Sequence, residues 1–248
     1  MGQLEGKVVV ITGAAGGQGA AEARLARAEG ATVVATDLSA PDTGTLNLPL
    51  DVTSRDAWEQ LAQHLEHELG RVDGLVNNAA TTGRTPLTEL SADEFERVQR
   101  VNVQGPLLGI QTMAPLMPSG SSIVNISSLA GLIASPTAAY TISKWALRGL
   151  SAVAAKELGP RGIRVNTVCP GYIESPMTAA APEAFRTNSV AAAPLRRLGS
   201  VDDVAPLVVF LLADVSSYLS GTEIPVDGGT WADGGASRIF DGVFRPAP

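Results

Sequence analysis

The sequence predicts an α/β fold: a single domain in which a doubly wound parallel β-sheet is flanked by helices on both faces. Short apolar, β-branched runs alternate with longer helical stretches, which is the pattern of βαβ units with right-handed crossovers. No internal repeat and no linker interrupts the 248 residues. Hydrophobic residues make up 45% of the chain and charged residues 17%, a composition typical of a compact globular domain.

The strands and helices are predicted from these runs in chain order. The first strand, residues 7–12, is apolar on both faces, as expected of a buried parallel strand. Six further strands are expected at about residues 31–36, 46–50, 73–76, 122–126, 163–168 and 223–226. Helices are expected at about residues 18–29, 55–69, 138–158 and 201–212, with another beginning at Ser91. Ser54 is a candidate cap for the second helix, and Ser91 with Glu94 has the form of a capping box.

A glycine-rich turn follows the first strand and reads Thr12-Gly13-Ala14-Ala15-Gly16-Gly17-Gln18-Gly19. Gly13, Gly17 and Gly19 let the backbone turn tightly and approach a pyrophosphate, which the next helix meets with free N–H groups. Any tight turn needs glycine, so the motif alone is weak. Its position between the first strand and the first helix favours nucleotide binding over a bare turn.

A second pattern, Tyr140-Thr141-Ile142-Ser143-Lys144, places a tyrosine and a lysine one helical turn apart on one face. A phenol has an ordinary pKa of about 10, and a nearby ammonium lowers it. Tyr140 could then exchange a proton with an alcohol or a ketone. Taken alone, the pair could also be an ordinary amphipathic couple on a helix.

The Gly-x-x-x-Gly-x-Gly spacing behind Thr12, together with Tyr-x-x-x-Lys, resembles the NAD-preferring subgroup of the short-chain dehydrogenase/reductase family. The resemblance covers about residues 4 to 230. It implies a Rossmann-type fold and hydride transfer between NAD and a secondary alcohol or ketone. In the family, Tyr140 would be the acid/base, and Lys144 would lower its pKa and hold the nicotinamide ribose. The family also has a helix between the second and third strands, which is expected to be reduced or missing here because residues 37–51 are few.

The cofactor site that the resemblance implies begins with Asp37, at the end of the second strand. Its carboxylate can accept hydrogen bonds from the adenosine ribose and would repel a 2′-phosphate. No Arg or Lys lies in the glycine turn or just after Asp37, so NAD is favoured over NADP. Asp37 can equally be a turn residue. The other implied cofactor contacts are Asp51 and Val52 at the adenine, Asn78 and Ala79 at the ribose, and Pro170, Gly171 and Ile173 at the nicotinamide.

The catalytic serine is a choice between two neighbours. The run Asn125-Ile126-Ser127-Ser128-Leu129-Ala130-Gly131 matches the family pattern Asn-Ile-Ser-Ser-x-x-Gly, which assigns Ser128. The usual gap to the tyrosine is about thirteen residues, yet Ser128 lies twelve before Tyr140. Ser127 fits the gap but not the motif. We favour Ser128, because a loop can lose a residue without moving a strand end.

Asn102 stands in a helical stretch at the position of the family's catalytic asparagine, which holds a water that links the lysine to solvent. Asparagine is mildly unfavourable inside a helix, and that placement supports a role. The alternative is a polar residue that bends the helix.

Residues 174–200 are expected to form the substrate lid. Their apolar composition favours an apolar secondary alcohol or ketone, with a cyclic or steroid-like substrate possible. Two rivals remain: an NADPH-dependent ketoacyl-carrier reductase, which Asp37 disfavours, and a non-catalytic dinucleotide-binding regulator. Regulators of that kind tend to lose the tyrosine or the lysine, and both are present.

The remaining expectations concern partners and setting. The helix with Tyr140 and Lys144 builds a dimer face in the family, so a homotetramer is expected. The tail, residues 231–248, would cover a neighbouring subunit's site or be ordered only in an oligomer. The formal net charge of −7 argues against nucleic acid. No signal peptide, membrane span or metal site is predicted. Cys169, the single cysteine, reads as a strand-end residue in a reducing cytoplasm.

Overall fold

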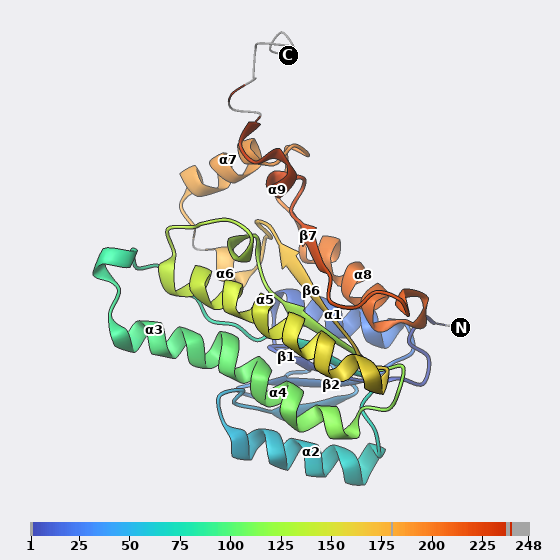
Figure 1. Cartoon of the computed structure of the whole chain (residues 1–248). Coiled ribbons are helices and arrows are strands. Elements are labelled where there is room, and N and C mark those ends of the chain that lie inside the picture. The colour runs from blue at the N-terminus through green and yellow to red at the C-terminus, as the bar shows by residue number, and fades with distance from the viewer. Residues whose placement is uncertain (1, 180, 237–238, 240–248) are drawn as a thin grey trace.

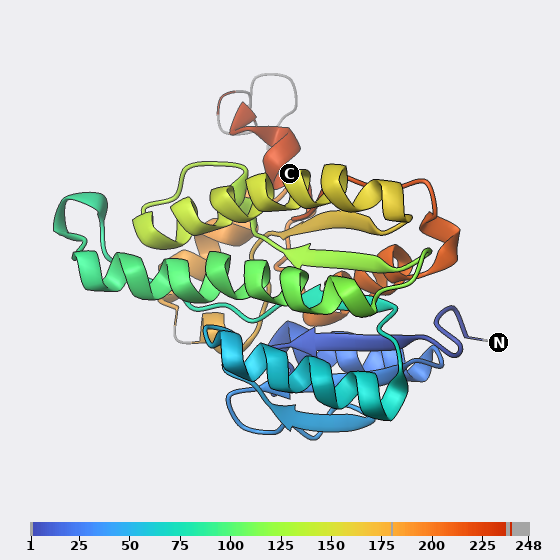
Figure 2. The same ribbon diagram turned by 60° about the horizontal axis from the view of Figure 1, so that its bottom comes forward.

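The computed structural model of the chain describes residues 2–179, 181–236 and 239. It is one domain with a seven-stranded parallel sheet in the order β3-β2-β1-β4-β5-β6-β7 (Figures 1 and 2). All seven predicted strands are present, so the predicted fold class is confirmed. The strands are β1 (Val8–Thr12), β2 (Thr32–Asp37), β3 (Leu46–Pro49), β4 (Gly74–Asn77), β5 (Ser122–Ile126), β6 (Arg164–Pro170) and β7 (Glu223–Val226).

Helices cover both faces of the sheet. The described helices are α1 (Gly17–Ala28), α2 (Arg55–Leu69), α3 (Ala92–Gln99), α4 (Gly105–Met113), α5 (Ala138–Leu158), α6 (Pro176–Ala179), α7 (Glu183–Ala192), α8 (Val201–Leu212) and α9 (Thr230–Asp233). One face packs against α1 and α8 and the other against α2, α4 and α5 (Figures 1 and 2). Successive residues of β1 supply both cores, since Val9 and Ile11 face α1 and α8 while Val8 and Val10 face the other layer.

The helix starts follow from side-chain caps. Ser54 accepts a hydrogen bond from the Ala57 backbone N–H at 3.2 Å, as predicted for the start of α2. Ser91 likewise accepts from the Glu94 N–H at 3.2 Å. The predicted capping box at Ser91 is only half formed, because the Glu94 carboxylate turns away and accepts from the Thr85 hydroxyl at 2.6 Å.

The connection between β2 and β3 contains no helix, as expected from its length. It folds back onto the glycine turn instead. The buried hydroxyl of Thr43 donates to the Ala14 carbonyl at 2.9 Å. The end of the sheet near β2 is therefore bordered by a short loop, where a helix would have formed a thicker wall.

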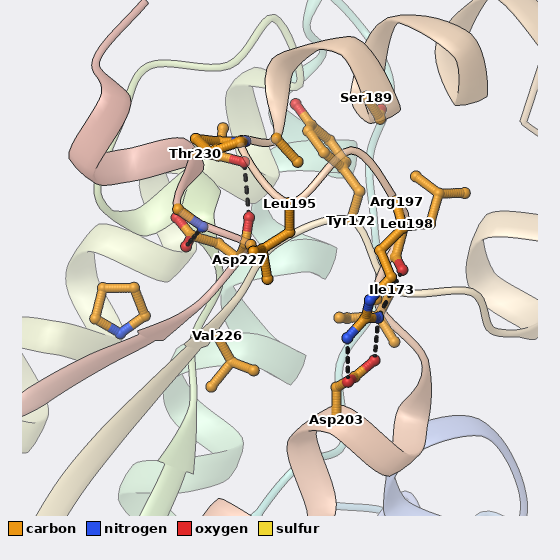
Figure 3. A pocket seen from close by; sticks show the side chains of 16 residues that line it. Tyr172, Ile173, Ser189, Leu195, Arg197, Leu198, Asp203, Val226, Asp227 and Thr230 are labelled. Carbon is orange, nitrogen blue, oxygen red and sulfur yellow. Dashed lines mark hydrogen bonds and ion pairs between the residues drawn. The ribbon is translucent and has the colours of Figure 1, made fainter.

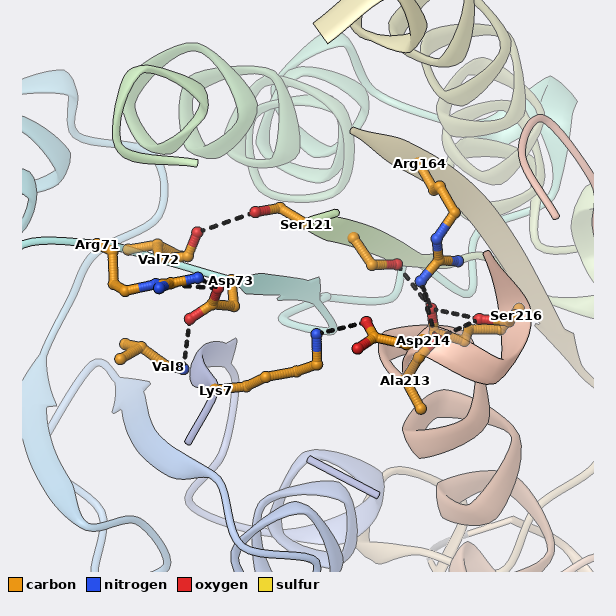
Figure 4. Close-up of polar contacts among 12 residues, drawn as sticks. Lys7, Val8, Arg71, Val72, Asp73, Ser121, Arg164, Ala213, Asp214 and Ser216 are labelled. Carbon is orange, nitrogen blue, oxygen red and sulfur yellow. Dashed lines mark hydrogen bonds and ion pairs between the residues drawn. The ribbon is translucent and has the colours of Figure 1, made fainter. Parts of the chain in front are cut away.

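The amino ends of the strands carry a network of paired polar groups (Figure 4). The buried Asp73 carboxylate accepts from the Val8 backbone N–H at 2.9 Å and is paired with Arg71. The Arg164 guanidinium donates to three backbone carbonyls, those of Leu211, Ala213 and Leu219. Lys7 and Asp214 form an ion pair at 2.7 Å. These contacts tie β1, β4 and β6 to the segment that follows α8.

The C-terminal tail can be followed only in part. Residues 231–236 and 239 are described, and the rest of the predicted tail, 237–238 and 240–248, lies outside the described residues. Across the part of the chain that the structure describes, no helix combines the length and the apolar character needed to cross a membrane.

Candidate active site

The predicted site residues gather at one edge of the sheet, because parallel strands direct their carboxyl ends the same way. In spatial order, β2 ends at Asp37, β1 at Thr12, β4 at Asn77, β5 at Ile126 and β6 at Pro170. The chain order reverses between β1 and β4, which is where open α/β sheets bind ligands.

The glycine turn has the shape of a cradle for a dinucleotide diphosphate. Gly13 has φ of 68°, a conformation that favours glycine. A Cβ on Gly19 would lie 2.3 Å from the Gly13 carbonyl oxygen, so a side chain there would break the turn. α1 starts behind Gly16 with no side-chain cap, and Gln18 lies in its first turn. The N–H groups of that turn therefore remain available to an anion. This backbone fits a dinucleotide.

The Asn78 segment braces this turn from β4. Asn78 donates its side-chain amide to the carbonyls of Thr12 and Gly13 at 2.9 and 3.1 Å. The Thr12 hydroxyl accepts in return from the backbone N–H groups of Asn78 and Ala79, at 3.1 and 3.0 Å. The structure thus joins both segments that the sequence assigned to the cofactor.

Asp37 contacts the glycine turn directly. Its carboxylate accepts from the backbone N–H of Ala15 at 3.0 Å and from that of Leu38 at 2.8 Å. Asp37 is therefore a turn residue, because it accepts from the next backbone N–H. It also lies beside the glycine turn, where a cofactor contact is predicted.

A hollow of about 420 Å³ lies at the adenosine end. Its lining residues are Leu38, Asp51, Thr53, Asp93, Glu96, Arg97, Arg100 and Val101. Asp51 accepts from the backbone N–H and the hydroxyl of Thr53, and the neighbouring Val52 is buried. The sequence did not predict that Arg97 and Arg100 lie at this hollow, because only cations in the glycine turn and just after Asp37 were expected to reach it. They come from α3 and the turn behind it, and nothing in their local sequence marks them as near β2.

Tyr140 and Lys144 lie on the first two turns of α5, which fixes them on one face of a helix. The Lys144 ammonium lies 5.5 Å from the centre of the Tyr140 ring and donates to the Ile126 carbonyl at 2.8 Å. Lys144 is 2% exposed. A fully buried lysine at the end of β5 is a costly placement that a purely structural helix face would avoid.

The pKa values of this pair are moved by burial. Burial raises the pKa of Tyr140, and the Ser128 side chain, which hydrogen-bonds it, opposes that rise. Burial lowers the pKa of Lys144 to about 8. Ser128 is thus one partner that lowers the pKa of Tyr140, and the lowering of this pKa by Lys144 with the bound nicotinamide stays a prediction.

The two serines at the end of β5 point in different directions. Ser127 is 3% exposed and donates its hydroxyl to the Lys144 carbonyl at 3.0 Å. Ser128 is half-buried and faces Tyr140, and its hydroxyl oxygen accepts from the Ala130 N–H at 3.1 Å. The geometry supports Ser128 as the serine that shares a substrate oxygen with Tyr140.

Asn102 lies in a π-helical turn, Arg100–Gln104, that joins α3 to α4. Such turns are frequent at functional sites. Both N–H groups of its side chain are engaged, with the Thr81 carbonyl and the Ser143 hydroxyl, each at 2.9 Å, and its amide oxygen accepts from the Thr81 N–H at 2.8 Å. The side-chain amide of Asn102 is therefore fully engaged, and the water that Asn102 is expected to hold stays a prediction. The side chain joins the loop after β4 to α5.

The segment after β6 leads into residues 174–200, the predicted lid. Gly171 donates to the Val226 carbonyl at 2.9 Å and lies so close to Asp227 that a Cβ would come within 2.7 Å of its Cα. Ile173 is buried and pairs with Gly199, which closes the lid at its base. α6 and α7 lie within the lid. Tyr172 meets Phe185 of α7 edge to face, with ring centres 5.1 Å apart.

A pocket of about 460 Å³ opens between the lid and β7 (Figure 3). Apolar side chains, among them Tyr172, Leu195, Leu198 and Val226, line most of it, and an Arg197–Asp203 ion pair at 2.7 Å lies at one end. Ser128, Tyr140 and Lys144 are not part of its lining. It therefore lies between residues 172–199 and β7, outside the group formed by these three side chains. Among the described residues, no cluster of three or more His, Cys, Asp or Glu is placed to hold a metal.

Comparisons with known proteins find relatives over almost the whole chain. Residues 13–230 match the protein family described as enoyl-(acyl carrier protein) reductase. The chain is 40% identical to the 3-oxoacyl-(acyl-carrier-protein) reductase of Thermotoga maritima, over 92% of this chain and 98% of that one. It is 35% identical to the cyclopentanol dehydrogenase of a Comamonas species, over 94% of this chain and all of that one.

A solved structure is also similar to this chain over nearly its whole length. A short-chain dehydrogenase/reductase from Brucella melitensis, described as a glucose/ribitol dehydrogenase, superposes with a TM-score of 0.86 at 31% identity. The match covers 93% of this chain and 99% of that one. The family binds a nicotinamide dinucleotide, and the relatives named here are oxidoreductases. By sequence and by structure, this chain belongs to the short-chain dehydrogenase/reductase family.

Proposed function

We propose that this chain is an NAD-dependent dehydrogenase or ketone reductase that acts on a secondary alcohol or its ketone. The observation that carries the proposal is the meeting of Ser128, Tyr140 and Lys144 at the carboxyl edge of the sheet, beside the glycine cradle. A structural helix face does not explain a fully buried lysine beside a half-buried tyrosine in that place.

The residues divide the work as follows. Ser128 and Tyr140 bind the substrate oxygen through their hydroxyls, and Tyr140 takes or gives its proton. The Lys144 ammonium holds the ribose next to the reacting ring and adds positive charge near Tyr140, which favours the phenolate. The bound nicotinamide supplies the hydride chemistry. Asn102 fixes the loop after β4 against α5, and a proton relay past it would use acceptor groups, because its amide N–H groups are engaged.

The preference for NAD is supported by Asp37, whose carboxylate beside the turn would repel a 2′-phosphate. Arg97 and Arg100 line the adenosine hollow, and their positive charges would attract a 2′-phosphate, which favours NADP. Initial rates with NADH and NADPH at equal concentration test the preference. A clear advantage for NADPH would favour the second candidate, a 3-ketoacyl-carrier reductase, to which the 40% identity with the Thermotoga protein points.

An apolar, cyclic substrate is supported by two observations. The pocket between the predicted lid and β7, which the catalytic side chains do not line, is lined mainly by apolar side chains and would offer an apolar surface to a substrate that extends beyond them. The relatives include a cyclopentanol dehydrogenase and a 3-alpha-(or 20-beta)-hydroxysteroid dehydrogenase of Mycobacterium bovis, the latter 38% identical over 93% of this chain and 92% of that one. A spectrophotometric screen of NAD and NADP against secondary alcohols, diols, sugars and steroids tests this class. Tight NAD binding without turnover of any of them would support a non-catalytic regulator.

Assembly into a homotetramer is part of the proposal. α5 exposes Ile142, Trp145 and Val153, with exposed fractions of 42%, 49% and 61%. Large apolar side chains along one helix face are typical of a subunit interface. Light scattering of the purified protein tests the oligomeric state.

A further inference from the structure

The position of Ser128 depends on a short turn, residues 128–131, which we call the serine turn. Its backbone is closed by a hydrogen bond from the Gly131 N–H to the Ser128 carbonyl at 2.8 Å. The Ser128 hydroxyl accepts from the Ala130 N–H at 3.1 Å within the same turn. A shift of Gly131 would therefore move the Ser128 backbone as well.

Gly131 is held from two sides. It packs tightly against α5, since a Cβ there would lie 3.0 Å from the Lys144 carbonyl oxygen and 2.6 Å from the Ser127 hydroxyl. Its own carbonyl accepts a hydrogen bond from Nη1 of Arg148. Because Gly131 is buried, this carbonyl has no water to replace that donor.

Arg148 is itself fixed by two further contacts. Its Nη2 lies 2.7 Å from the Glu223 carboxylate, on the first residue of β7. Its guanidinium carbon lies 4.8 Å from the centre of the Trp145 ring. The ion pair raises the pKa of Arg148, so the side chain stays charged. A planar guanidinium with partners on two sides is a rigid link, which a lysine would not reproduce.

We propose that Arg148 is a positioning residue for the reaction, which holds Gly131 and thereby keeps Ser128 facing Tyr140. The inference rests on the proposed function. Tyr140, Lys144 and Arg148 follow one another at intervals of four residues, so one face of α5 carries the acid/base, the lysine and the anchor of the serine turn. The link from Arg148 also explains how Ser128 reaches Tyr140 although the loop between them is one residue shorter than the resemblance implies.

The test replaces Arg148 with methionine, which keeps much of the side-chain volume and removes the donors. We expect kcat to fall by about ten- to a hundredfold, because a small misplacement of a positioning group has effects of that size. The KM for the nicotinamide cofactor should stay near the wild-type value, since Arg148 contacts none of the residues assigned to it. Lys156→Met, which removes an exposed cation from the same helix, is the matched control and should leave kcat unchanged.

Two further measurements separate positioning from general stability. The contact with Ser128 lowers the pKa of Tyr140, so its loss should move the rise of kcat in alcohol oxidation to higher pH in Arg148→Met. Glu223→Gln keeps an acceptor for Arg148 and leaves the bond to Gly131, so its kcat should stay within about threefold of wild type. An equal loss of kcat in Arg148→Met and Glu223→Gln would show that the ion pair, and not the bond to Gly131, carries the effect, and it would overturn the proposal.

A readout that needs no activity decides the inference independently. Hydrogen exchange measured on a peptide that covers the serine turn should be faster in Arg148→Met than in wild type, and unchanged in Lys156→Met. Unchanged exchange in Arg148→Met would overturn the inference even in an active enzyme. Faster exchange in a protein that turns over no alcohol would leave Arg148 as the anchor of the turn and refute the proposed function. If Arg148→Met does not fold, Arg148→Lys is judged by the same exchange and pH measurements.

Discussion

The two edges of the sheet treat buried charge in opposite ways. At the amino edge, the Asp73 carboxylate and the Arg164 guanidinium are buried and satisfied, by backbone groups and by Arg71 (Figure 4). At the carboxyl edge, Lys144 is buried and Tyr140 is half-buried, and burial displaces the pKa values of both from the ordinary ones. On the proposed function, the same strands carry structural charges at one end and reactive groups at the other. Each prediction below tests one side of that contrast.

The largest effect is expected at Tyr140. Tyr140→Phe removes the acid/base while keeping the ring, so turnover should fall by about a thousandfold or more. NAD affinity, measured by the quenching of tryptophan fluorescence, should stay nearly unchanged. Tyr218→Phe is the control, because Tyr218 is fully exposed and far from the site in sequence. Retained activity in Tyr140→Phe would refute its role.

The amino edge should show the reverse behaviour. Arg164→Met leaves buried carbonyls without their donor, and we expect the free energy of unfolding to drop by about 3 kcal/mol. The kcat of the folded fraction should not change. Urea denaturation measures the first quantity, with Arg55→Met on the exposed face of α2 as the control. A loss of kcat with intact stability would contradict the division between the edges.

Glu22, in the middle of α1, differs from the paired groups of the amino edge, since its carboxylate is buried with no hydrogen-bond partner among the described residues. Burial raises its pKa from 4.5 to about 8. A carboxyl with a raised pKa gives its full stability below pH 4.5, and that stability is lost as the pH rises through 8. We therefore expect the free energy of unfolding of wild type to fall by about 3.5 kcal/mol between pH 5 and pH 8, with a slope of roughly 1.4 kcal/mol per pH unit midway between the two pKa values.

The matched variant is Glu22→Gln, which cannot ionise. It should lose this pH dependence, while Glu66→Gln on the exposed face of α2 should keep it. Urea denaturation at pH 5, 6.5 and 8 gives the change of the unfolding free energy with pH for wild type and for each of the two variants. Parallel curves for wild type and Glu22→Gln would show that Glu22 is not buried as a neutral acid.

The smallest effect distinguishes the two serines. Ser128→Ala should lower kcat by about ten- to a hundredfold, since one hydrogen bond to the reacting oxygen is lost. Ser127→Ala removes only a bond to the Lys144 carbonyl and should cost about 1 kcal/mol of stability with little change in kcat. Side-by-side kinetics and thermal melts of the two variants decide between them. A larger kinetic loss in Ser127→Ala would reverse the assignment.

The sequence predicts the order of strands and helices well, because each buried strand can be recognised from its own residues. β1, β4, β5 and β6 are buried along their whole length, and such strands are runs of apolar, β-branched residues. Helix starts are local as well, and Ser54 and Ser91 cap α2 and α3 as predicted. The predicted hydrogen bond from the Ser91 backbone N–H to the Glu94 carboxylate does not form. The hydroxyl of Thr85, a residue outside the motif, donates to that carboxylate instead.

The site is less predictable where distant segments meet. Neighbouring residues at a strand end point in opposite directions, so the motif alone could not decide between Ser127 and Ser128. Arg97 of α3 and Arg100 of the turn behind it reach the adenosine hollow from a segment that starts more than fifty residues after Asp37. The contacts of Arg148 with Gly131 and Glu223 join three separate elements, and no local spacing encodes them.

The short connection between β2 and β3 has a practical consequence. Because a loop closed by Thr43 borders the adenosine end, the hollow there opens to solvent next to the exposed side chain of Leu38. A nucleotide seated in the cradle would keep its adenine edge within reach of bulk water. A linker attached to that edge could then lead outward without displacing the fold, which makes this enzyme a candidate for immobilised-cofactor synthesis.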